Sequence, residues 1–273
     1  MGEKNIIVSV ICYNNEKEVV GFARQMVSQE GLSLKLLITC NATKSKEAFL
    51  EDLNGIGKDI QVFFPEENLG YLKGCLYGIE QYGKPYDWAL ISNTDLTIEK
   101  DFIYEIFKDD VGKDVWGIGP NIILASNGRQ QNPLSINRPS TKKIKFLSTI
   151  YKSYWMFCLY SRLAKIKQNI FNKRTSIIDP RCVYAIHGSC FFLRRDCVEQ
   201  IIREKSPIFM YDEEFLIAEL ARENDKNMYY LPTASVIHNE NQSTKTVESR
   251  RKHIWYRDST NYIWERFFKR SKR

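Results

Sequence analysis

The chain has 273 residues, 43% of them hydrophobic, which suffices for one substantial core with an appended lobe. Its seven cysteines are scattered and odd in number, and its first thirty residues lack the pattern of a secretory signal, so we expect a cytosolic protein with reduced thiols rather than a secreted disulfide scaffold. The net charge of +7 is unevenly divided, because acidic residues prevail in 1–114 and 179–244 and basic residues in 115–178 and 245–273.

Strands and helices alternate along the first hundred residues. The run "NIIVSVICY" (5–13) is typical of a strand buried on both faces of a parallel sheet, and "EKEVVGFARQMVSQ" (16–29) has helical spacing. The alternation continues with predicted strands at 34–40, 60–64 and 87–92 and predicted helices at 44–53 and 70–82. Strands joined by helices of this length predict an α/β fold with a Rossmann-like, open, mostly parallel sheet and helices on both faces.

Polar residues follow the predicted strands, at Tyr13, Asn41, Asn68 and Asn93. Ligands bind open α/β sheets outside the carboxyl ends of the strands. In "LISNTDLT" (90–97) a buried strand gives way to Asp95, whose carboxylate can face that crevice and bind a hard cation such as Mg²⁺ or Mn²⁺. Alternatively, Asp95 caps a helix that begins near Ile98.

The segment "NLGYLKGCLYGI" places Gly70, Gly74 and Gly78 four residues apart. On a helix this spacing makes a stripe without side chains, which permits close backbone approach. The segment lacks the G-x-G-x-x-G arrangement, so a dinucleotide site is not supported.

The segment "YDEEFLIAELAR" concentrates Asp212, Glu213 and Glu214 at the expected start of a helix. Acidic residues stabilise helix N-termini by capping and through the macrodipole, which is one interpretation. In the other, a partly desolvated carboxylate near other negative charge has a raised pKa suited to general-base catalysis.

Histidines and cysteines in the second half allow further interpretations. His238 follows the expected strand "YYLPTASVI" and is either a structural hydrogen-bonding residue or a ligand. In "HGSCFFLRR" a tight turn at Gly188 precedes an apolar strand, and His187 lies before it. A zinc site made of Cys182, His187, Cys190 and Cys197 would lack the close C-x-x-C pairs of structural sites, so we interpret these residues as part of the core.

Basic and aromatic residues are interleaved in 142–174 and in the C-terminal segment. This pattern suits a helix that lies on an anionic membrane, with aromatic residues at the interface. No uncharged run reaches the roughly 18–20 residues that a spanning helix needs. The alternative is an ordinary helix packed on the core. Both interpretations stay open for 142–174, whereas for the C-terminal helix we favour membrane binding. We find no helix-turn-helix, zinc-finger or RNP pattern, and expect no nucleic-acid partner.

Taken in order, "NLGYLKGCLYGI", "NTD", "HGSCFFLRR", "FMYDEEFLIAELAR" and "VIHNENQST" resemble the motifs of family-2 glycosyltransferases with the GT-A fold. The resemblance covers roughly residues 5–244 and is greatest to bacterial enzymes of cell-surface polysaccharide synthesis, such as rhamnosyltransferases. It implies an inverting, metal-dependent hexosyltransferase that uses a nucleoside-diphosphate sugar.

The resemblance also implies roles for single residues. "NTD" matches the family's DXD metal motif with Asn93 in place of the first Asp, so Asp95 is the metal ligand, with Mg²⁺ or Mn²⁺, and His238 is a second candidate. Glu214 matches the catalytic base of the "ED" motif, where the family usually has Asp, and Glu213 is the fallback. Candidates for binding the nucleotide-sugar are Tyr13, Asn41, Asn68, Gly70, Asn93 and Gly188, with Thr43 a weaker one. Cys40 stands where the family usually has Asp, which leaves the nucleobase open.

The expected organisation follows from these assignments. Residues 1–114 form the nucleotide-sugar-binding half of one domain, 115–244 the acceptor-binding half with a basic insertion at about 140–175, and 245–273 a basic amphipathic helix. We expect a saccharide acceptor, on a lipid carrier, and a peripheral position on the inner face of the cell membrane. A homo-oligomer is left open.

Two other functions stay open. A nucleotidyltransferase would share the sheet and the metal-binding carboxylates, but "CYNNEKE" after the first strand has no glycine and so lacks a phosphate loop. The second is a non-catalytic module with the GT-A fold that only binds nucleotide-sugars.

Overall fold

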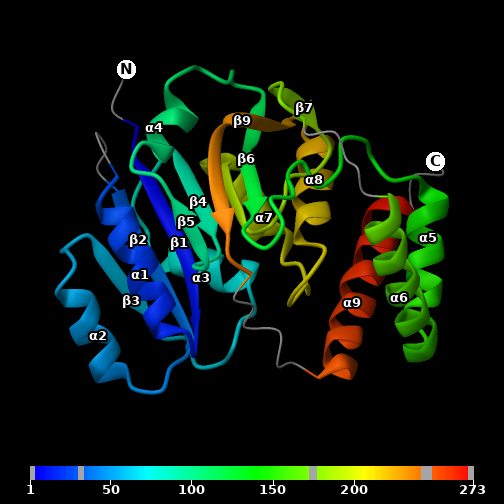
Figure 1. Ribbon diagram of the computed structural model, residues 1–273, viewed down its shortest axis with the longest axis horizontal. Helices are drawn as coiled ribbons and strands as arrows, with labels where there is room; N and C mark the ends of the chain where they lie inside the picture. The colour runs from blue at the N-terminus through cyan, green and yellow to red at the C-terminus, as the bar shows by residue number, and fades with distance from the viewer. Residues whose placement is uncertain (1–3, 30–33, 172–176, 241–247, 270–273) are drawn as a thin grey trace.

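The computed structural model describes residues 4–29, 34–171, 177–240 and 248–269. Its strands form one nine-stranded sheet in the order β3-β2-β1-β4-β8-β6-β9-β5, with β7 paired to β9 (Figure 1). Parts of the expected basic segments, at 172–175, 245–247 and 270–273, and the end of "VIHNENQST" lie outside the described residues.

The first half of the chain forms the parallel part of the sheet. Its strands pair in parallel register and are β1 (Ile6–Tyr13), β2 (Leu34–Ala42), β3 (Ile60–Phe63) and β4 (Trp88–Ser92). The helices that join them are α1 (Glu16–Val27), α2 (Lys46–Asn54) and α3 (Leu72–Tyr82). These bounds confirm the alternation that the hydrophobic runs predict.

The second half completes the sheet with strands of both directions. Strand β8 (Cys190–Arg194) is antiparallel to β4 and to β6 (Val115–Leu124), and β6 is parallel to β9 (Asn227–His238). The short strands β5 (Leu96–Ile98) and β7 (Arg181–Val183) are antiparallel to β9. Strands β5, β7 and β8 therefore run against the other six, and the sheet is mostly parallel as predicted.

Helices cover both faces of the sheet because alternate side chains of the buried strands point to opposite faces. On β1, Val8 and Val10 pack with residues of α1, α2 and α4 (Phe102–Phe107). Ile7 points the other way and belongs to the cluster that contains residues of α3, α7 (Arg195–Glu204) and α8 (Glu213–Glu223). Both faces are thus apolar and covered, which fits the continuous apolar run of β1.

Three further helices lie at one end of the molecule. Helix α9 (Ser249–Ile263), continued by the π-helix η1 (Trp264–Phe268), packs beside α5 (Thr141–Ile150) and α6 (Tyr154–Phe171) (Figure 1). Ile263, Phe267 and Phe268 are buried in the core. The apolar residues at the end of the C-terminal helix are therefore covered by protein, which favours packing over the membrane for that part of the helix.

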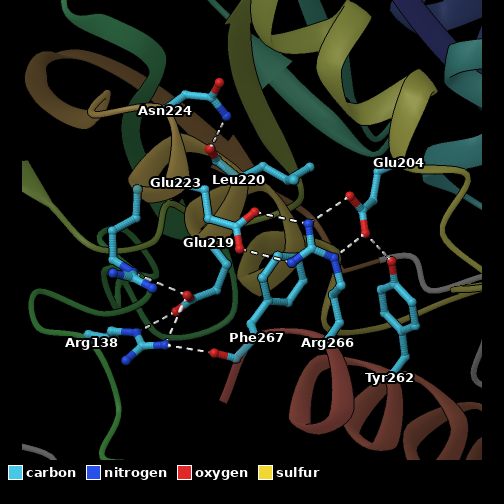
Figure 2. A network of polar contacts seen from close by, with 10 residues as sticks. Arg138, Glu204, Glu219, Leu220, Glu223, Asn224, Tyr262, Arg266 and Phe267 are labelled. Carbon is cyan, nitrogen blue, oxygen red and sulfur yellow. Dashed lines mark hydrogen bonds and ion pairs between the residues drawn. The ribbon is translucent and has the colours of Figure 1, made fainter. Parts of the chain in front are cut away.

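Ion pairs fasten the C-terminal helix to the rest of the domain. Figure 2 shows the Arg266 guanidinium between the carboxylates of Glu204 and Glu223, with nitrogen–oxygen distances of 2.8 Å to each. Beside it, Arg138 donates two hydrogen bonds, of 2.6 and 3.0 Å, to the fully buried carboxylate of Glu219. Glu219 also accepts hydrogen bonds from Arg222 at 3.2 Å and from the Tyr184 hydroxyl at 2.8 Å, so this buried charge has several partners.

Candidate active site

The carboxyl ends of β1, β2 and β4 meet the start of β8 at one edge of the sheet. Ser92 at the end of β4 pairs with Cys190 at the start of β8, and the backbone N–H of Asn93 donates to the carbonyl oxygen of Ser189 at 2.8 Å. Tyr13 ends β1 at the same edge, with an exposed side chain. The sequence-predicted residues from distant segments are thus brought to one place.

Asp95 and His238 face each other at this edge. The chain after Asp95 forms β5 rather than the start of a helix, because Leu96 pairs with His238 on β9, and α4 begins only at Phe102. The capping alternative for Asp95 is therefore wrong. Both side chains are buried, and His238 Nε2 lies 3.3 Å from Asp95 Oδ1.

The chemistry of this pair fits a cation ligand set. His238 Nδ1 lies 2.7 Å from Gln131 Oε1, so the other ring nitrogen, Nε2, faces Asp95. Asp95 Oδ1 is buried without a hydrogen-bond partner in the described part of the chain. Metal-binding histidines are commonly held in this way by a second acceptor. No group of three His, Cys, Asp or Glu among the described residues is arranged for a metal, so further ligands would come from substrate.

His187 lies half-buried beside the pair, with its ring centroid 6.4 Å from that of His238. Burial, with a smaller effect of charge on His238, lowers the pKa of His187 to about 4. Its Nδ1 accepts a hydrogen bond from the Ser189 backbone N–H at 3.2 Å. Cys190 is buried in the core as expected, whereas Cys182 is exposed, so the assignment of Cys182 to the core is wrong and the described residues do not form the zinc set.

A hollow of about 330 Å³ lies at the end of β2, lined by residues 40–47 with Phe64 and Pro65. Of the two candidates there, Thr43 donates to Glu16 Oε1 at 2.7 Å. The Asn41 amide donates to the Gly70 carbonyl at 2.9 Å and accepts from the Leu69 N–H at 3.2 Å. Asn41 thereby holds the 69–70 loop in place along one side of the hollow.

The 68–71 loop is pressed against the second half of the chain. Gly70 has φ +77°, and a Cβ on it would come within 2.1 Å of the Phe209 carbonyl oxygen, so only glycine fits there. Asn68 Oδ1 accepts from the Gly70 N–H at 2.9 Å, and the Tyr71 hydroxyl donates to the Gly188 carbonyl at 2.8 Å. Gly74 and Gly78 serve close packing as expected, since added Cβ atoms would meet β1 and β2 side chains at 2.5 and 2.8 Å.

Glu214 reaches the same turn from helix α8. The Gly188 N–H donates to Glu214 Oε1 at 3.0 Å, and a Cβ on Gly188 would come within 2.6 Å of that oxygen. Because Ser189 in this turn accepts from Asn93, one turn contacts both the carboxylate of Glu214 and the segment that carries Asp95.

The acidic cluster is poised to exchange a proton near neutral pH. Removal from water, chiefly, raises the pKa of Glu214 to about 7 and that of Glu213 to about 8, and their mutual repulsion adds to the effect on Glu213. Burial raises the pKa of Asp212 to about 6, although the hydrogen bonds from Thr260 and Ser259 act in the opposite direction and lower it. Desolvation and neighbouring negative charge thus make both Glu213 and Glu214 hold a proton to higher pH than a free carboxylic acid does.

Helix α9 holds this cluster, which sequence reasoning missed. Asp212 is the N-cap residue of α8 but makes no capping hydrogen bond; its Oδ2 accepts from Thr260 Oγ1 at 2.6 Å. Tyr211 and Asp212 both have positive φ, 69° and 61°, and the Tyr211 ring stacks on Tyr256 at 4.0 Å. Strained backbone of this kind persists when surrounding contacts enforce it.

Comparison with solved structures identifies the architecture. The mannosyltransferase PcManGT from Pyrobaculum calidifontis, solved with GDP-Man and Mn²⁺, aligns with a TM-score of 0.57 and 10% identity over 92% of this chain. GalNAc-T7, solved with UDP, GalNAc and Mn²⁺, gives 0.56 and 13% over 98%. S. aureus TarS, solved with UDP-GlcNAc, gives 0.55 and 13% over 89%. The chain has the GT-A fold.

The chain is shorter than these proteins, of which it covers 62%, 51% and 61%. No family model and no curated protein matches its sequence. At such low identity the likeness establishes the GT-A fold alone, and the chemistry must be argued from the side chains at the edge of the sheet.

Proposed function

We propose that the protein is an inverting glycosyltransferase that moves a sugar from a nucleoside-diphosphate sugar to a hydroxyl group of a saccharide acceptor. One observation carries the proposal: in a GT-A fold, Glu214 and the segment of Asp95 contact the same Gly188-Ser189 turn. A metal-binding carboxylate and a proton acceptor in one place are the two groups that such a transfer needs.

Asp95 and His238 would hold a divalent cation, Mg²⁺ or Mn²⁺, with Asn93 beside them. The bound cation would supply positive charge that stabilises the departing nucleoside diphosphate. Solved proteins of the same fold contain Mn²⁺ with GDP-Man or with UDP and GalNAc. The nucleoside would occupy the hollow at the end of β2, which Asn41 lines. Tyr13, Asn68, Gly70 and Gly188 are the other residues proposed to contact the donor.

Glu214 is the proposed base, and Glu213 is the fallback. The Glu214 carboxylate takes the proton of the acceptor hydroxyl, whose oxygen bonds to the anomeric carbon while the bond from that carbon to the phosphate oxygen breaks. This single displacement inverts the configuration, and the nucleoside diphosphate leaves with the electron pair. A pKa near 7 suits a base that works at neutral pH.

The acceptor is proposed to be a growing surface polysaccharide on a lipid-diphosphate carrier, at the inner face of a bacterial cell membrane. The donor half is 1–114, and the acceptor half is 115–244. Support comes from the basic residues of the second half and from the resemblance in motifs. Within the described part of the chain, no helix is long and apolar enough to cross a bilayer.

A nucleotide-sugar panel with Mn²⁺ tests the reaction, read as released nucleoside diphosphate with and without acceptor saccharides. We expect release with one or a few donors, stimulation by an acceptor, and a loss of about 10²–10⁴-fold in turnover for Glu214→Gln with donor binding retained. Glu80→Gln, an exposed carboxylate on α3, is the matched control. Release of pyrophosphate instead would indicate a nucleotidyltransferase, and donor binding without any release would indicate a binding module.

A further inference from the structure

Helix α6 presents an apolar stripe to solvent. Trp155, Leu159, Leu163 and Ile166 recur at spacings of three and four, and Met156 extends the stripe. All five are exposed, Trp155 by 76% and Leu159 by 60%. Large apolar side chains that are exposed side by side, rather than singly, mark an interaction surface.

The opposite side of α6 is already occupied by protein. The Phe157 ring packs 5.1 Å from His253 and 5.6 Å from Tyr256 of α9, and Tyr154 lies 5.4 Å from His253. The helix therefore rests on α9 through its aromatic side and turns its aliphatic side outward. Phe146 of α5, 54% exposed and 6.3 Å from the Tyr160 ring, widens the apolar surface.

The chain segment that carries this surface is strongly basic. Residues 115–178 contain 11 Lys and Arg and no Asp or Glu. Lys142 lies one helical turn before Phe146, Lys152 lies in the turn between α5 and α6, and Arg162 lies beside the stripe on α6; all three are exposed. Two copies docked through this surface would bring like charges together, whereas an anionic surface would be complementary.

We propose that the α5–α6 face (Phe146, Trp155, Met156, Leu159, Leu163 and Ile166) docks on an anionic lipid bilayer. Its apolar side chains enter the boundary between headgroups and acyl chains, and the surrounding Lys and Arg lie near the headgroups. The inference rests on the proposed function in one respect only, that the acceptor is lipid-linked. It assigns membrane contact to α5 and α6 in place of the C-terminal helix.

The docked face would lie close to the acidic cluster. The Tyr151 ring, at the end of α5, is 6.2 Å from Tyr256, and Tyr256 stacks on Tyr211 next to Asp212. His253 Nε2 also lies 2.7 Å from the Tyr151 carbonyl oxygen. Helix α9 thus packs against α5 and α6 on one side and against the loop of Tyr211 and Asp212 on the other.

Co-sedimentation with vesicles of phosphatidylcholine, with and without phosphatidylglycerol, tests the proposal. The full chain should bind the anionic vesicles, less at about 1 M salt than at about 0.1 M. The double variant Trp155→Ser, Leu159→Ser should bind at least about tenfold more weakly, because two large apolar side chains are no longer transferred from water into the bilayer. Ile254→Ser, an exposed apolar residue of α9, should bind as the wild type does. Because the replaced side chains are exposed, unchanged circular dichroism is expected.

Three results would overturn the proposal. They are failure of the wild type to bind anionic vesicles, undiminished binding by the double variant, and a wild-type dimer in light scattering that the double variant dissociates. Vesicle binding needs neither donor nor acceptor, so the failure of this inference and the failure of the transfer reaction are seen in separate assays.

Discussion

Glu214 Oε1 lies 3.0 Å from the backbone nitrogen of Gly188, and this contact ties a carboxylate of helix α8 to the turn that precedes β8. The next residue of that turn, Ser189, accepts a hydrogen bond from Asn93, two residues before Asp95. One turn therefore contacts the proposed base on one side and the proposed metal-binding segment on the other.

The first prediction concerns the pH dependence of the rate. A base with a pKa of about 7 is protonated and inactive below that value, so kcat/KM should fall as the pH drops through about 7. Initial rates measured from pH 5 to 9 would show this decrease in kcat/KM. A rate that is flat down to pH 5 would remove Glu214 from the role of base.

The same carboxylate should affect stability in a pH window. The unfolded chain ionises Glu214 near 4.5 and the folded protein only near 7, so the folded state holds more protons between these values and loses stability as the pH rises. Glu214→Gln should therefore stabilise the protein by about 1 to 3 kcal/mol more at pH 8 than at pH 5. Urea unfolding at the two pH values measures this, and an equal effect at both would contradict the raised pKa.

Gly188→Ala should impair catalysis while the fold persists. The new Cβ would press on Glu214 Oε1, the end of a side chain that can move aside, so the base is displaced. We expect turnover to fall about 10–100-fold, because a misplacement of about 1 Å can cost that much. Gly21→Ala on α1, where nothing lies within 4 Å of the added Cβ, is the control and should keep full activity. Equal activity of both variants would show that the contact has no catalytic effect.

Thr260→Val should loosen the acidic loop. It removes the 2.6 Å hydrogen bond to Asp212 and leaves a poorly solvated carboxylate, at a cost of about 1–3 kcal/mol. The pKa of Asp212 should rise, and because less charge on Asp212 lowers the pKa of Glu214, the fall in kcat/KM should move to lower pH. Thr260→Ser keeps the hydroxyl and should restore both stability and pH profile. If Val and Ser variants behave alike, α9 does not position the cluster.

Much of the first half of the chain could be predicted from sequence, because β1, β2 and β4 are largely buried and have continuous apolar runs. The short strand β5 could not be predicted, because it forms by pairing with β9, where Leu96 lies opposite His238, a residue far along the chain. The end of β4 before Asn93 was predicted correctly, whereas β2 continues to Ala42, past the predicted end at Cys40, and therefore includes Asn41.

The support of the acidic cluster was beyond sequence reasoning. Thr260 and Tyr256 lie in a segment whose basic and aromatic pattern favoured a membrane helix, and only packing distinguishes a covered apolar side from an exposed one. On α6 the same kind of pattern leaves the apolar side of the helix exposed, as Trp155 shows. Periodicity gives the face of a helix but not what lies against it.

The most direct test of the central claim is titration calorimetry of nucleoside diphosphates, UDP and GDP in turn, into wild type and Asp95→Asn, with Mn²⁺ or with EDTA. The account predicts that one of them binds the wild type in Mn²⁺, binds at least about tenfold more weakly in EDTA, and is similarly weakened by Asp95→Asn, since carboxylate and phosphates share the cation. Equal affinity in EDTA, or an unaffected Asp95→Asn variant, would contradict the metal site and with it the proposed transferase.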